Sequence, residues 1–208
     1  MSISRKSMIA VIVVTVFLSM IIGAYVVNPL YNAQNAPPPK TGALTMIITS
    51  DNWYNNSSGY QAAFFVVENG HIESSSMITA AAHTLLEITI MNYDKATDPL
   101  LVNNDANVTG TVGDVVYEYN NTLVNASGAG VISPRGEFVL TSVPASKISH
   151  TFTTNTGLNI PVYPSSTEVA YAYFNTTGLY TWACMCNCGP VAMDHSGWMF
   201  GDIQVVSQ

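Results

Sequence analysis

The stretch TWACMCNCGPVAMDHSGWMFG, residues 181–201, decides how this sequence is interpreted. It begins inside one run typical of a β-strand, Gly178–Cys184, and ends before another, Asp202–Val206. All three cysteines of the chain lie in it, followed by a histidine and two methionines. Thiolate, imidazole and thioether groups are the ligands that favour copper. A loop that carries all of them between two strands predicts a metal site on a β-fold.

The candidate ligands of this loop are Cys184, Cys186, Cys188, His195 and Met199. Zinc also binds cysteine and histidine, but structural zinc sites use two separated ligand pairs, and the spacing here is different. A thioether also argues for copper. Outside the cell such a group of thiols would either bind a metal or oxidise to a disulfide, and the sequence leaves both outcomes open.

A copper electron-transfer site also needs an imidazole from an earlier strand, which would clamp the metal between the loop and the body of the fold. His150 is placed for this role, close to an aromatic residue and 34 positions before Cys184. His71 follows an Asn-Gly turn signal, and His83 has no second ligand nearby. Trp198, on the loop itself, is the candidate aromatic residue through which electrons would enter.

The fold class follows from short runs of β-branched and aromatic residues separated by Gly, Asn, Ser and Pro. No run has a helical period of adequate length. The sequence therefore predicts an all-β, Greek-key sandwich. The expected strands are Leu44–Thr49, Gln61–Glu68, Thr84–Met91, Val112–Tyr119, Glu137–Ser142, Glu168–Phe174, Gly178–Cys184 and Asp202–Val206.

The N-terminal region predicts a membrane anchor. Residues 8–27 carry no charge over 20 positions, enough to cross a hydrocarbon core about 30 Å thick. Arg5 and Lys6 precede this segment, so residues 1–7 are expected in the cytoplasm and the rest of the chain outside the cell. A cleaved signal peptide is the alternative, but the apolar run exceeds the usual length and no small-residue cleavage site follows.

The remaining organisation is read from composition. A proline-rich linker is expected over residues 28–42, and the extracellular domain over 43–208. Residues from about 95 to 134 are rich in Asn, Gly, Asp and Thr, which predicts an insertion serving as surface decoration or as a docking loop. Glycosylation sequons support the outside location and begin at Asn55, Asn56, Asn107, Asn120, Asn125 and Asn175.

Charge excludes one class of partner. The net charge is −7, and only six residues are Lys or Arg. A nucleic-acid partner is not expected, because no stripe of basic residues could neutralise its phosphates. No nucleophilic triad, phosphate loop or pair of catalytic carboxylates stands out either, so the sequence does not support a hydrolase. An extracellular binding or adhesion sandwich with a Cys184–Cys188 disulfide remains an alternative class.

Residues 138–206 resemble the cupredoxin domain of subunit II of heme–copper terminal oxidases, of archaeal cytochrome or quinol oxidase type. The motifs that carry the resemblance are His150-Thr-Phe152, Gly178-Leu-Tyr180, Cys184-x3-Cys188-Gly189 and Met199-Phe200-Gly201-Asp-Ile203-x-Val205. Residues 84–94 (TLLEITIMNYD) resemble the preceding strand, and the single N-terminal span resembles the one-helix version of that subunit. The resemblance is good only over the last third of the chain.

The resemblance implies a dinuclear copper centre in an electron-relaying subunit that has no oxygen-reducing centre of its own. Cys184 and Cys188 would bridge two copper ions, His150 would be the first imidazole, Cys186 would contribute its carbonyl, and Met199 its thioether. An external donor, whether a cytochrome, another cupredoxin or a quinol, would reduce the site. The electron would pass to a heme in membrane subunit I.

The sequence departs from the family's pattern at the second imidazole ligand. Its usual positions hold Ala192 and Ser196, so His195 could serve only through a longer loop. Two alternatives therefore remain beside the oxidase subunit. One is the metal-free subunit II of a quinol oxidase with a Cys184–Cys188 disulfide. The other is a membrane-anchored mononuclear blue-copper carrier, similar to sulfocyanin, with Cys188, His150, His195 and Met199 as ligands.

Overall fold

The structure is a computed structural model that describes residues 41–51, 61–119, 131–132 and 136–207. The predicted cytoplasmic tail and membrane span, and the linker as far as residue 40, lie outside these ranges and stay predictions. Within the described ranges, no helix has the length and apolar character needed to cross a membrane. Of the sequons, Asn107 and Asn175 are described and both are exposed.

The described residues form two β-sheets. In spatial order the first sheet contains β3 (His71–Ser74), β2 (Ala63–Glu68), β1 (Thr41–Thr49), β5 (Leu85–Asn92), β11 (Thr167–Tyr173), β6 (Val116–Tyr119), β8 (Phe138–Leu140) and β7 (Val131–Ile132). The second contains β10 (Asn159–Val162), β9 (His150–Thr154), β12 (Gly178–Ala183), β13 (Phe200–Val206) and β4 (Met77–Ala81). The helical elements are short: η2 (Asn103–Ala106), η3 (Ala145–Lys147) and α3 (Pro190–Asp194).

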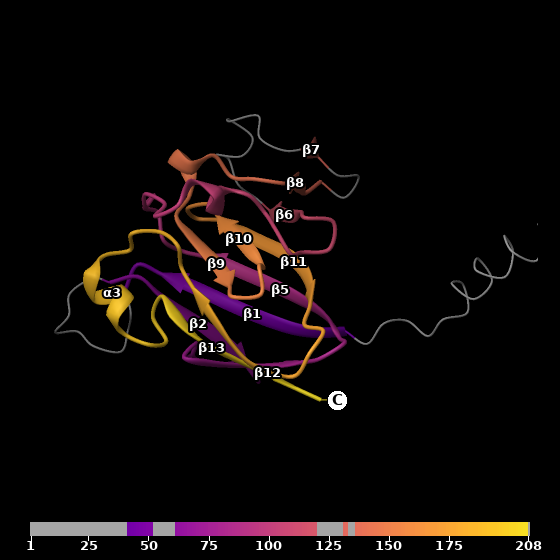
Figure 1. The fold of residues 1–208 in the computed structure, drawn as a ribbon. Coiled ribbons are helices and arrows are strands. Elements are labelled where there is room, and N and C mark those ends of the chain that lie inside the picture. The colour runs from indigo at the N-terminus through magenta and orange to yellow at the C-terminus, as the bar shows by residue number, and fades with distance from the viewer. Residues whose placement is uncertain (1–40, 52–60, 120–130, 133–135, 208) are drawn as a thin grey trace, which may run out of the picture. The chain divides into compact units, whose positions relative to one another are not determined.

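The chain passes repeatedly between the two sheets, and this gives the sandwich its non-sequential strand order (Figure 1). Most neighbouring strands are antiparallel, but β1 runs parallel to β5 and β13 runs parallel to β4. The loop between β12 and β13, which contains the cysteines and α3, lies at the end of the sandwich away from the C-terminus (Figure 1). The predicted all-β sandwich is confirmed.

The core lies between the sheets and follows the alternation expected of strands buried on one face. Along β5, β11 and β13 every second residue is buried. The rings of Phe64 and Phe152 pack on the indole of Trp182, with centroid distances of 5.1 and 5.5 Å. The indole nitrogen donates a hydrogen bond to the carbonyl of Ser75 at 3.0 Å. A Cβ at Gly201 would come within 2.7 Å of that nitrogen, so this position requires glycine.

Each of the eight predicted strands overlaps a strand of the structure, although the ends differ by several residues. The sequence interpretation missed β3, β4, β7, β9 and β10. β9 begins at His150, so the predicted ligand lies on a strand, although no strand was predicted over these residues. In the region predicted as an insertion, β6 is a member of the large sheet and pairs with β11.

Two glutamates face the interior from adjacent strands of the large sheet. Glu118 on β6 and Glu168 on β11 are cross-strand partners, and both are fully buried. One carboxylate oxygen of Glu168 accepts hydrogen bonds from the Tyr163 amide at 2.8 Å and the Ser166 hydroxyl at 2.6 Å. Burial raises the pKa of Glu168 more than the hydrogen bonds with Glu118 and Ser166 lower it, and the result is about 7.

The raised pKa of Glu168 predicts that the fold is more stable at acidic pH. Between pH 4.5 and about 7 the folded state retains a proton at Glu168 that the unfolded state has lost, so the free energy of unfolding falls as pH rises through this window. Across this window the free energy of unfolding changes by up to about 3 kcal/mol. Thermal unfolding measured from pH 4 to 8 should show a falling Tm that flattens in Glu168→Gln. An equal slope in the variant would contradict the assignment.

Candidate metal centre

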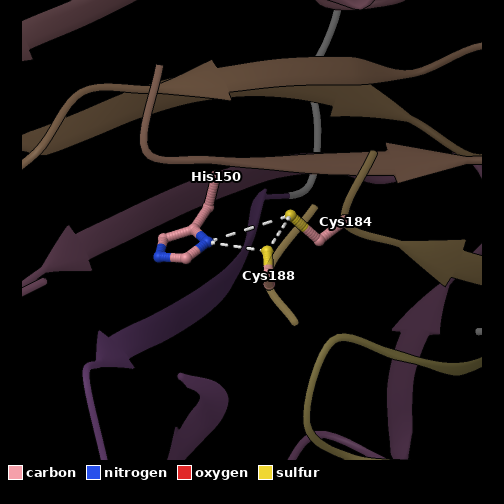
Figure 2. Close-up of side chains that lie close together, drawn as sticks. All are labelled: His150, Cys184 and Cys188. Atoms are coloured by element: carbon pink, nitrogen blue, oxygen red, sulfur yellow. Dashed lines mark hydrogen bonds between the residues drawn. The ribbon is translucent and has the colours of Figure 1, made fainter. Parts of the chain in front are cut away.

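Three predicted ligands come together at the cysteine loop (Figure 2). His150 Nδ1 lies 3.3 Å from Cys188 Sγ and 3.9 Å from Cys184 Sγ, and the two sulfurs are 3.3 Å apart. His150 and Cys184 are fully buried, whereas Cys188 is partly exposed. All three cysteines of the chain are free thiols in the structure, so no disulfide joins Cys184 to Cys188.

The three ligand atoms fit a single metal ion. They form a triangle with sides of 3.3, 3.3 and 3.9 Å. The point equidistant from its corners lies about 2 Å from each atom, close to the metal–nitrogen and metal–thiolate bond lengths of about 2.0 to 2.3 Å. Two thiolates and one imidazole are ligands suited to copper. An ion at this point would need no rearrangement of the side chains.

Backbone contacts between β9 and the cysteine loop fix this geometry. The amide of Thr151, next to His150, donates to Cys184 Sγ at 3.3 Å, and the Met185 amide donates to the Thr151 hydroxyl at 2.8 Å. The Cys184 amide donates to the carbonyl of Met199 at 2.7 Å, which closes the loop across the β12–β13 hairpin. The sulfurs therefore belong to a loop held at both of its ends.

The outer side of the cysteine loop is covered by residues 98–101. The Leu101 amide donates to the Met185 carbonyl at 2.9 Å, and the Asn187 amide donates to the Pro99 carbonyl at 2.9 Å. These bonds satisfy loop backbone groups that would otherwise have no strand partner. The start of the region predicted as an insertion is thus part of the wall of the site.

A carboxylate that the sequence interpretation did not select binds the second ring nitrogen of His150. Asp94, two residues beyond the end of β5, places its Oδ2 at 3.0 Å from His150 Nε2. The ring also packs edge-on against Phe64, with a centroid distance of 6.2 Å. The only sequence signal for Asp94 was its place after a predicted strand, and strand pairing could not show that it reaches His150.

The electrostatics of the metal-free site favour one thiolate. Burial opposes ionisation of Cys184, but hydrogen bonds from Cys186, Cys188 and His150 outweigh it and hold the pKa of this thiol well below its usual value. The hydrogen bond with Cys184, followed by burial, raises the pKa of Cys188. Burial lowers the pKa of His150, but hydrogen bonds with Asp94 and Cys184 raise it to about 9. The result is a pair of a His150 imidazolium and a Cys184 thiolate, and a cation bound here would displace the Nδ1 proton of His150 and the thiol proton of Cys188.

The remaining predicted site residues are placed as follows. Cys186 and Met199 are fully buried, and the Cys186 thiol does not belong to the His–Cys–Cys group of ligand atoms found among the described residues. The Cys186 carbonyl accepts the Cys188 amide at 3.0 Å. His195 is exposed and packs on the ring of Trp198 at 4.5 Å, and Trp198 itself is only 5% exposed. The ligand roles of Cys186, His195 and Met199, and the electron-transfer role of Trp198, stay predictions.

Comparison with known proteins gives no family by sequence: no family model and no curated protein matches the chain. Solved structures do resemble it. A multicopper oxidase from Campylobacter jejuni has a TM-score of 0.40 and 12% identity, over 83% of this chain and 31% of that one. Auracyanin B has a TM-score of 0.36 and 11% identity, over 82% and 92%. Rusticyanin from Thiobacillus ferrooxidans has a TM-score of 0.34 and 11% identity, over 80% and 78%.

The chain spans less than half of the multicopper oxidase chains that it resembles. Each TM-score is below 0.5, so the class of the protein rests on its own strands and side chains. They define an all-β, cupredoxin-like sandwich that carries a His–Cys–Cys cluster at one end.

The geometry predicts unequal roles for the three cysteines. Cys184→Ser and Cys188→Ser should each weaken copper binding at least about 100-fold, because each removes one of three ligands. Cys186→Ser should bind nearly as tightly as wild type, because a serine hydroxyl can still donate to the Cys184 sulfur. Competition with a chromophoric copper chelator measures all three. Equal losses in the three variants would mean that Cys186 is itself a ligand.

Proposed function

We propose that this protein is a copper electron-transfer protein in which His150, Cys184 and Cys188 hold one copper ion. The observation that carries the proposal is the triangle of Nδ1 and two Sγ atoms, whose equidistant point lies at metal-bond length from all three. The chemistry of the donors supports copper, because soft thiolates with an imidazole are the set that suits it.

A bound copper ion would supply one-electron redox chemistry. The chain's own contribution is to keep the ligands in one arrangement. Thr151 donates its amide proton to the Cys184 sulfur and so stabilises negative charge there. Phe64 packs against the His150 ring and excludes water from it. Because these groups are fixed by sheet hydrogen bonds and core packing, little rearrangement would accompany a change of charge at the site.

The position of the histidines supports a site with one metal ion rather than two. A dinuclear centre of the oxidase type requires a second imidazole beside the bridging cysteines. His195 is exposed and stacked on Trp198, and among the described residues the cluster contains only His150. The mononuclear set proposed here also differs from a one-thiolate blue site, because Cys184 belongs to the cluster and His195 does not.

Subunit II of a heme–copper oxidase remains the second candidate. It is favoured by a specific observation: both cysteines of the Cys-x3-Cys pair turn their sulfurs toward the same point. In that case the partners would be a heme-bearing membrane subunit and an external donor, namely a cytochrome, a cupredoxin or a quinol. For either candidate we propose anchoring by residues 8–27, with the copper domain outside the cell.

Metal analysis and spectroscopy of the copper-loaded full chain test the proposal. We expect one copper ion per chain, a thiolate-to-copper absorption band, a paramagnetic resonance signal from a single Cu(II), and reversible one-electron reduction. His195→Ala should leave these spectra unchanged because its side chain lies outside the cluster.

The possible outcomes separate the candidates. Two ions per chain with a purple mixed-valence signal, abolished in His195→Ala, would favour the oxidase subunit and overturn the mononuclear assignment. A reduced chain that takes up no copper would overturn both candidates.

A further inference from the structure

The imidazole of His150 is held from the side opposite the sulfurs by a single carboxylate. Asp94 Oδ2 lies 3.0 Å from Nε2, while Nδ1 lies 3.3 and 3.9 Å from the two sulfurs. A ring that donates its Nε2 proton to a carboxylate has its other nitrogen free to bind a cation once the Nδ1 proton leaves. The orientation of the ring is therefore fixed before any metal arrives.

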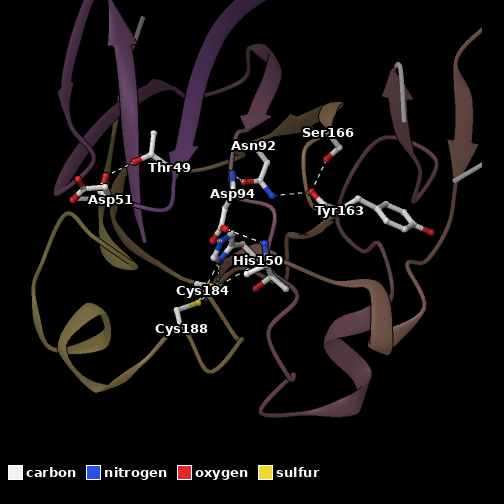
Figure 3. A network of polar contacts seen from close by, with 11 residues as sticks. Thr49, Asp51, Asn92, Asp94, His150, Tyr163, Ser166, Cys184 and Cys188 are labelled. Carbon is white, nitrogen blue, oxygen red and sulfur yellow. Dashed lines mark hydrogen bonds and ion pairs between the residues drawn. The ribbon is translucent and has the colours of Figure 1, made fainter. Parts of the chain in front are cut away.

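Asp94 is itself held by two hydrogen bonds of its own and, through Asn92, by a third (Figure 3). Its Oδ1 accepts the Ala96 amide at 3.0 Å, and the Asp94 amide donates to the Asn92 side chain at 2.9 Å. The Asn92 amide group donates in turn to the Tyr163 carbonyl at 2.7 Å. Asp94 and Asn92 are both buried, so neither side chain can swing into solvent without breaking these bonds.

We propose that Asp94 is a positioning residue of the copper centre: it retains the Nε2 proton of His150, directs Nδ1 toward Cys184 and Cys188, and through its charge favours the oxidised ion. This inference rests on the proposed function. A buried carboxylate next to a ligand stabilises Cu(II) more than Cu(I), because the interaction grows with the charge of the ion.

The competing explanation is that Asp94 only caps the turn after β5, through its bond to Ala96. Two substitutions separate these roles. Asp94→Asn removes the charge and leaves one accepting oxygen, which can serve His150 Nε2 only with the amide nitrogen turned toward Ala96, because the two bonds use different oxygens of the carboxylate. Asp94→Ala removes the oxygen as well. Asp114→Asn is the matched control, because it also removes one charge from a carboxylate that accepts a backbone amide, that of Gly110, in an exposed turn.

The test uses the full chain, metal-free and loaded with Cu(I) or Cu(II). Nuclear magnetic resonance of ¹⁵N-labelled histidine reports exchange of the Nε2 proton with water. In Asp94→Ala this proton should lose its protection and copper affinity should fall about 10- to 100-fold. In Asp94→Asn protection should persist, while the ratio of Cu(II) to Cu(I) affinity falls about tenfold, a rise in potential of about 59 mV. Asp114→Asn should match wild type in both readouts.

Wild-type protection and wild-type affinities in Asp94→Ala would overturn the inference while leaving copper binding intact. An unchanged affinity ratio in Asp94→Asn would overturn the electrostatic part alone. A wild-type chain that binds no copper would overturn the proposed function, and the exchange readout of the metal-free chain would then decide whether Asp94 holds the ring.

Discussion

A fully buried imidazole must find a partner for each ring nitrogen, and in this protein the two partners come from different sheets. Asp94, at the end of β5 in the large sheet, binds Nε2 of His150. The sulfurs that follow β12 in the smaller sheet contact Nδ1. His150 thus joins the two layers of the sandwich at the end where the cysteine loop lies. The site depends on the packing of the two sheets, and its geometry cannot be separated from the fold.

Hydrogen bonds link the metal site to the buried Glu118–Glu168 pair. Tyr163 accepts a hydrogen bond from Asn92, which positions Asp94 (Figure 3). Its amide donates a proton to Glu168. Ser166 donates to the Tyr163 carbonyl and to Glu168. Asp94 and Glu168, two buried acidic groups, are therefore connected through the backbone at Tyr163. Glu168 retains a proton near neutral pH because burial raises its pKa, whereas the effect of burial on Asp94 is outweighed by its hydrogen bonds with His150 and Ala96, which together lower its pKa.

The sequence predicted β11, β12 and β13 well, and the cysteines that follow β12 sit close together in the chain. It also selected three residues that the structure brings together, His150, Cys184 and Cys188. It missed β9 and β10, whose sequences HTFTT and NIPV contain polar residues or proline in place of an alternating apolar pattern. Asp94 and the Glu118–Glu168 pair could not be found either, since the first depends on contact between the two sheets and the second on pairing between strands far apart in sequence.

His195 shows the limit of reasoning from spacing. It lies among the candidate ligands in the sequence, but α3 and the residues after it carry it to the surface, where it packs on Trp198. Ala192, at a position where the oxidase family has an imidazole, is buried and offers no donor atom. A short loop can place a residue on either side of a site, and only the backbone path decides which. The Cys184 sulfur, by contrast, accepts the amide of Thr151 on β9, and the Cys184 backbone is bonded to Met199, just before β13.

The central claim is that two sulfurs and one nitrogen hold one copper ion. X-ray absorption fine structure at the copper edge of the loaded full chain tests it most directly. The account predicts two sulfur neighbours and one imidazole nitrogen at about 2.0 to 2.3 Å, with no copper neighbour. A copper–copper vector, or a shell with one sulfur and two imidazole nitrogens, would contradict it.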